Sequence, residues 1–142
     1  NPTEREFMPR IILAAVAACL LLAAPASAAQ SCMKWEDGVR TAAEFSRDRN
    51  DRIAAVLLTA EETAATWNAL FPGKEGPHVL GVMVSQSDPG TAFVAGFDAG
   101  GCRVGSGSLP FGVVLDAMVK VDVQSAFVII EPAKAEPPGE GA

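Results

Sequence analysis

The sequence predicts an α+β domain with two layers: an antiparallel sheet of about four strands, and two helices on one face of that sheet. Three observations support this class. Several short apolar runs are bounded by turn residues, as strands are. Two longer stretches repeat their apolar residues with the period of an amphipathic helix. These elements alternate in the order β-α-β-β-α-β, with short connections between them.

The first strand and the first helix adjoin each other. Ile53 to Leu58 is an apolar run without alternation, which favours a strand covered on both faces. The next residues form a capping box, in which the Thr59 hydroxyl and the Glu62 carboxylate each accept an early backbone N–H of a helix. Pro72-Gly73 ends that helix. Its apolar stripe consists of Ala60, Ala64, Trp67 and Phe71.

A hairpin is predicted next along the chain. His78 to Ser85 and Thr91 to Phe97 are rich in strand-forming residues, and Gln86 to Gly90 between them has the composition of a tight turn. Asp98 to Gly101 turns the chain again. Cys102 to Val104 is compatible with a continuation of the same ladder.

The C-terminal part predicts a loop, a helix and a strand. Gly105 to Gly107 has the composition of a loop, and Pro110 then begins a helix. Val121 to Ile130 alternates at first, which predicts a last strand with one face partly in water. The buried face of the helix consists of Phe111, Val114, Leu115 and Met118.

The order of these elements matches the split β-α-β, or ferredoxin-like, arrangement, in which the strands at 53–58 and 91–97 would be central. An alternative is an α/β layer with another strand order, in which residues 30–50 supply an extra helix. That segment has only a faint helical face, and Arg47 to Asp51 is expected to be a solvated turn.

The N-terminus predicts export. Residues 8–28 have the basic start, the apolar stretch and the small residues Ala26 and Ala28 of a signal peptide, with cleavage after Ala28. Residues 1–7 are interpreted as an upstream extension. Two alternatives are a lipidated Cys19, because Val16 to Cys19 resembles a lipobox, and an uncleaved anchor. Contact with a membrane is expected only if Cys19 is lipidated or the signal remains as an uncleaved anchor.

The remaining chain is expected to be a single domain at residues 29–130, followed by a disordered tail at 131–142 that is rich in Pro and Gly. The whole chain of 142 residues has a formal net charge of −6 and no basic run. Nucleic acid is therefore excluded as the main partner.

Two cysteines follow the signal, and in an oxidising compartment Cys32 and Cys102 are expected to form a disulfide that serves stability alone. The alternative is a reactive Cys102 thiolate assisted by His78. A single histidine provides little support for that chemistry or for a metal site. No cofactor and no metal are predicted.

A Gly-rich stretch suggests an anion-binding loop before the last helix, made by Arg103, Gly105, Gly107 and Ser108. It lacks the lysine of a phosphate-binding loop, so a plain connection is the alternative. The acidic residues form no recognisable catalytic pair. Trp35 and Trp67 are expected to lie in the core or to cover the disulfide.

These features favour a small exported binding or interaction module that is not an enzyme and whose partner is an unidentified protein or small molecule. One alternative is a periplasmic enzyme that uses Cys102 or carboxylates brought together in space. Another is a structural component of the cell envelope.

Overall fold

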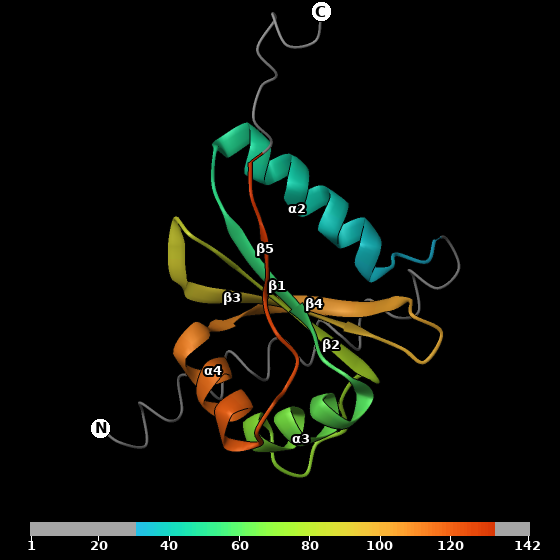
Figure 1. Cartoon of the computed structure of the whole chain (residues 1–142). Coiled ribbons are helices and arrows are strands. Elements are labelled where there is room, and N and C mark those ends of the chain that lie inside the picture. Colours follow the sequence, from blue (N-terminus) through green and yellow to red (C-terminus); the bar gives the residue numbers. More distant parts are fainter. Residues whose placement is uncertain (1–30, 133–142) are drawn as a thin grey trace, which may run out of the picture.

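The computed structural model describes residues 31–132, which form three helices and five strands (Figure 1). The predicted signal, Cys19 and nearly all of the predicted tail lie outside these residues. Within 31–132 no helix has the length and apolarity needed to cross a membrane. The elements, in chain order, are α2 (Trp35–Arg49), β1 (Ile53–Leu57), α3 (Ala60–Leu70), β2 (Val79–Ser85), β3 (Asp88–Phe97), β4 (Arg103–Pro110), α4 (Phe111–Lys120) and β5 (Val128–Ile130).

All five strands belong to one antiparallel sheet with the order β4-β3-β2-β1-β5. The α+β class is confirmed, whereas the ferredoxin-like order is not. β1 and β3 are interior strands, as expected, but β2 lies between them. Each strand from β1 to β4 pairs with its neighbour in the sequence, which places β2 between β1 and β3. The sheet has five strands instead of about four, because β4 forms at residues that were expected to be mainly loop.

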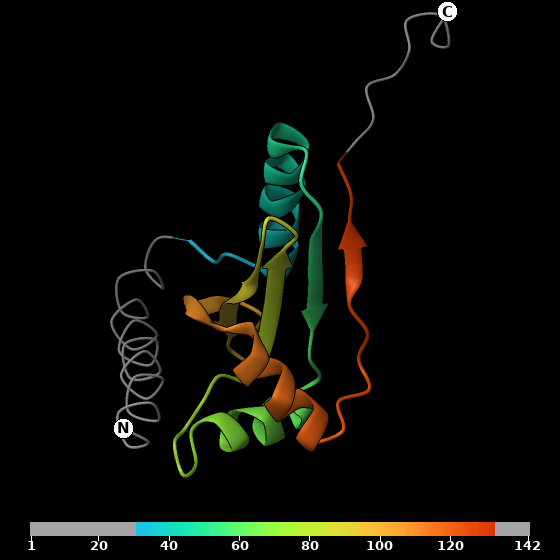
Figure 2. The ribbon, with the colours of Figure 1, turned by 90° about the vertical axis from the view of Figure 1, so that its left-hand side faces the viewer.

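The two faces of the sheet are covered by different helices. α3 and α4 pack against each other and against one face, where Leu80 and Val82 of β2 are almost completely buried. α2 lies on the opposite face, because its residues contact Gly81 and Met83, which alternate with those core residues. Figure 2 shows α3 and α4 together and α2 apart from them. The sheet is therefore the middle of three layers, not one of two.

α3 begins as its sequence predicts. Thr59 Oγ1 accepts from the backbone N of Glu62 at 3.1 Å, and Glu62 Oε1 accepts from the backbone N of Thr59 at 3.1 Å. This reciprocal cap satisfies N–H groups that the first turn of a helix leaves unpaired. The inward face of α3 carries Trp67 and Leu70 into the core.

α2 replaces the weakly patterned segment and most of the expected turn at Arg47 to Asp51. The helix continues to Arg49 and ends where Asn50 adopts the left-handed conformation, with φ of 53°. Ala42 and Ser46 form its buried side, which packs toward β1 and β5. Its pattern was faint because so few large apolar residues face the sheet. The alternative with an extra N-terminal helix is thus correct in that detail.

The predicted strand at Val121 to Ile130 is wrong over most of its length, because only Val128–Ile130 pairs with β1. The preceding segment is held instead by a side chain of α3. Glu62 Oε2 accepts from the backbone N of Gln124 at 2.7 Å and from that of Ser125 at 3.1 Å. Since this carboxylate binds the N–H groups, residues 121–127 do not form a strand. They form a segment that lies over α3, which we call the strap.

Candidate ligand-binding pocket

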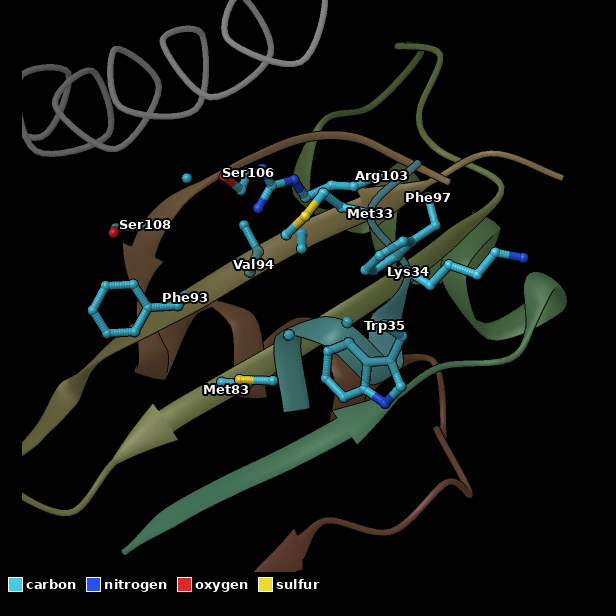
Figure 3. Close-up of a pocket in the computed structure, with 14 residues that line it drawn as sticks. Met33, Lys34, Trp35, Met83, Phe93, Val94, Phe97, Arg103, Ser106 and Ser108 are labelled. Atoms are coloured by element: carbon cyan, nitrogen blue, oxygen red, sulfur yellow. The ribbon is translucent and has the colours of Figure 1, made fainter. Parts of the chain in front are cut away.

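A pocket of about 350 Å³ lies on the α2 side of the sheet, beside the N-terminus of α2 (Figure 3). α2 packs on β1 and β5, and the pocket occupies the part of this face formed by β2, β3 and β4. Its volume is in the range of small-molecule sites. Fourteen residues line it: Met33, Lys34, Trp35, Gly38, Gly81, Met83, Phe93, Val94, Ala95, Phe97, Arg103, Ser106, Gly107 and Ser108.

One wall of the pocket is apolar. Phe93, Ala95 and Phe97 of β3 point to the same face because they alternate along the strand. The ring of Phe97 meets Trp35 edge to face, with centroids 6.1 Å apart, and is buried. Phe93 has no such cover and is 49% exposed. An aromatic ring left this open beside a concave surface is available for contact with a ligand.

The other wall is a polar row on β4. Register pairing places Ser108 opposite Phe93, and Ser106 opposite Ala95. Arg103 joins this row through a β-bulge: Gly96 pairs with Gly105, and Phe97 pairs with Arg103, which leaves Val104 as an extra residue. Without the bulge, alternation would direct Arg103 to the opposite face. Figure 3 shows the Arg103 side chain extending along this rim toward Ser106.

The charged residues that line the pocket are both cations, Lys34 and Arg103, in a chain with 17 acidic and 11 basic residues. The ion pairs within residues 31–132 leave both without a carboxylate partner. Figure 3 shows the ammonium group of Lys34 pointing away from the other labelled side chains. Arg103 is therefore the cation best placed to meet a ligand.

The Cys32–Cys102 disulfide lies at the edge of the pocket and confirms the predicted pairing, with Cα atoms 4.9 Å apart. Each cysteine is followed by a residue of the pocket lining, Met33 and Arg103. The backbone N of Arg103 also donates to the Met33 carbonyl at 2.7 Å. Neither sulfur is a thiolate in this bond, so the structure does not support catalysis by Cys102.

The Gly-rich stretch is a strand and not the predicted loop. Gly105 is buried in the sheet opposite Gly96, while Arg103, Gly107 and Ser108 line the pocket. Because β4 runs directly into α4, no separate loop remains to present backbone N–H groups to an anion. Glycine and serine suggested a loop, but pairing with β3 determines the conformation. The alternation of glycine and serine from Gly105 to Ser108 does not by itself identify a strand, because glycine is disfavoured in strands.

Among residues 31–132, three carboxyl groups have lowered pKa values, and none of the three lines the pocket. Backbone N–H donation from Lys34 lowers the pKa of Asp37, with help from Arg40. The Ser87 hydroxyl lowers that of Asp51. The Ser125 hydroxyl and the N–H groups at the start of α3 and in the strap lower the pKa of Glu62 to about 2. Asp37 caps the start of α2, whereas Asp51 and Glu62 each fasten one segment to another.

The remaining candidate residues are separate from one another. His78 is exposed, and its backbone N donates to the Phe97 carbonyl at 3.0 Å. Trp67 lies in the core, as expected, whereas Trp35 is half-buried and forms part of the pocket. The part of the chain from 31 to 132 has no cluster of three side chains able to hold a metal ion.

No protein-family model matches the chain, and comparison with curated proteins and with solved structures finds no match.

Proposed function

We propose that this protein is an exported, non-enzymatic binding module whose ligand site is the pocket beside α2. The observation that carries this proposal is the apolar hollow between Trp35, Met83 and the uncovered ring of Phe93. Its volume of about 350 Å³ corresponds to about a dozen non-hydrogen atoms, if each takes up roughly the 30 Å³ of a liquid water molecule. A small molecule is thus the fitting ligand.

Two further features support the binding role. The carboxyl groups with displaced pKa values serve as caps and fasteners, and a catalytic acid or base would instead be expected to face the pocket. The disulfide is consistent with an oxidising compartment, as the export signal implies. Rigid strands and a cross-linked segment form the walls, which suits a preformed site.

The test is binding of a small neutral probe, 1-octanol, followed by amide chemical shifts in NMR spectra. We expect shifts at Gly81, Ala95 and Ser106, and little change on α4. Phe93→Ser should lower the affinity for 1-octanol several-fold, because the exposed ring contributes contact area without supporting the core. Leu115→Ser is the matched control, since Leu115 is a similarly exposed apolar residue on α4.

Equal weakening by both variants, or shifts spread over the surface, would contradict a specific pocket. Concentration-dependent self-association without any effect of the probe would instead favour a structural envelope component. Export is tested by intact-mass analysis of protein collected outside the cytoplasm. That protein is expected to begin at Ala29, and a retained apolar segment or a lipid adduct at Cys19 would contradict cleavage there.

A further inference from the structure

We propose that the ligand of this pocket is an elongated amphipathic anion: a molecule of about ten non-hydrogen atoms with an apolar body and a carboxylate or similar head group. This inference rests on the proposed binding function and specifies the chemistry that the site selects. The apolar body would lie along Phe93, Ala95 and Phe97, and the head group would meet Arg103.

The first argument is the arrangement of the two walls. Neighbouring strands lie about 4.8 Å apart, so the apolar row of β3 and the polar row of β4 run side by side at the width of a single acyl chain or aromatic ring. From Phe93 to Phe97 the row is about 13 Å long, at about 3.3 Å per residue. A molecule lying along the strands can touch both rows at once.

The second argument is charge. Acidic residues outnumber basic residues in the chain, but no acidic residue between 31 and 132 lines the pocket. Three acids adjoin lining residues in the sequence. Asp37 Oδ1 accepts from Arg40 at 2.9 Å, and Asp98 Oδ1 accepts from the backbone N of Gly100 and of Cys102, both at 2.9 Å. Glu36 is exposed and is not part of the lining. The electrostatic surroundings of the pocket therefore favour an anion over a cation.

The third argument is the geometry of Arg103. The bulge at Val104 directs this side chain to the pocket face, and the part of the chain described here offers its guanidinium no carboxylate. A guanidinium donates two parallel N–H bonds to a carboxylate, which fixes orientation as well as charge. Ser106, next along the rim, adds a hydroxyl that can donate to the same head group.

The experiment compares three probes that share an eight-carbon chain: octanoate, 1-octanol and octylammonium. Calorimetry and NMR titration are performed on the purified disulfide-bonded protein. Octanoate should bind up to about fivefold more tightly than 1-octanol, and octylammonium should bind most weakly, because an exposed ion pair contributes up to about 1 kcal/mol, which converts to about fivefold. The preference should decrease as salt is added.

The key variant is Arg103→Gln, which should remove the preference for octanoate over 1-octanol. Arg47→Gln is the matched control: it removes the same charge from the far end of α2, so the change in net charge is equal. Arg103→Lys keeps the charge without the two-pronged geometry and should retain part of the preference. Thermal unfolding monitored by circular dichroism verifies that each variant is folded.

Several outcomes would overturn the inference. Equal binding of octanoate and 1-octanol, with no effect of Arg103→Gln, would mean that the pocket takes neutral ligands, and the proposed function would stand without this refinement. Tightest binding of octylammonium would also reject it. Co-sedimentation with anionic phospholipid vesicles but no binding of free octanoate would assign the surface to a membrane instead. If no probe binds, the proposed function itself fails.

Discussion

Trp35 lies so close over Gly81 that a Cβ atom on this glycine would be 2.3 Å from Cζ3 of the indole. The residue pair joins the N-terminus of α2 to the middle of β2, and Trp35 is also a wall of the pocket. Glycine is thus required at this position by the close approach of an aromatic ring, not by its backbone conformation.

Gly81→Ala is expected to displace the indole, and so to alter the pocket and lower stability by about 1–3 kcal/mol, the usual effect of overpacking. Chemical denaturation measures the loss, and Trp fluorescence reports the displacement. Gly90→Ala is the control, because nothing lies within 4 Å of a Cβ built there. If both variants have the same stability and the same spectrum, the indole does not occupy this position.

The disulfide is expected to contribute about 4 kcal/mol by restricting the unfolded chain, given the sequence separation of 70 between its cysteines. The double variant Cys32→Ser/Cys102→Ser should accordingly melt about 15 °C lower. The sequence predicted a role in stability alone. Because Met33 and Arg103 adjoin the bridge, we now expect weaker binding of 1-octanol as well.

That binding is measured well below the melting temperature of the double variant, where the sheet stays folded. If the folded double variant binds 1-octanol with unchanged affinity, the disulfide contributes to stability alone, as the sequence predicted.

Trp67→Ala should destabilise the protein by about 3–5 kcal/mol, because it empties a buried aromatic position in contact with Phe71. Trp67→Phe should cost less, since Trp67 Nε1 has no hydrogen-bond partner within the described structure and no such bond is lost. Urea denaturation of both variants measures the difference. A loss within about 0.5 kcal/mol for the alanine variant would place Trp67 at the surface.

Glu62 makes stability depend on pH on the acid side. Hydrogen bonds from Ser125, from Thr59 and from the strap hold its pKa at about 2, below the ordinary 4.5. Its contribution is complete above pH 4.5 and is lost as the pH falls toward 2. Glu62→Gln should lower stability at pH 7 and reduce the slope of stability against pH in this interval.

Melting temperatures measured from pH 7 to pH 2 test this prediction. Glu61→Gln is the control, because Glu61 precedes Glu62 in the same helical turn and makes no hydrogen bond to the strap. An identical acid profile for wild type and Glu62→Gln would show that the strap is not held by this carboxylate.

Local interactions explain which elements the sequence predicted correctly. The capping box at Thr59 identifies the start of α3, because it depends on residues within a few positions of one another. The predicted apolar stripe is correct only for Trp67 and Phe71: Ala60 and Ala64 are exposed. Thr63 and Thr66 are buried in their place. The disulfide was predicted from the presence of only two cysteines after the predicted signal. β1 and β2 were recognisable because their apolar runs are buried on both faces.

The missed features depend on contacts with other elements of the fold. β4 is a strand because β3 pairs with its glycines and serines, and residues 121–127 are a strap because Glu62 binds them. The pocket could not be predicted, since it requires α2 to cover β1 and β5 while leaving Phe93 open. The bulge at Val104, which brings Arg103 to the site, is likewise a product of pairing.

The placement of β5 beside β1 also affects how the chain reaches this structure. β1 to β4 can associate in sequence order, through connections that are short or helical, whereas the β1–β5 ladder joins the first strand in the sequence to the last. Contacts between distant segments form late, because a long loop must close first. During synthesis the outer edge of β1 therefore stays unpaired until β5 leaves the ribosome. In that interval Ile53 to Leu57 is the segment most exposed to pairing with another nascent chain.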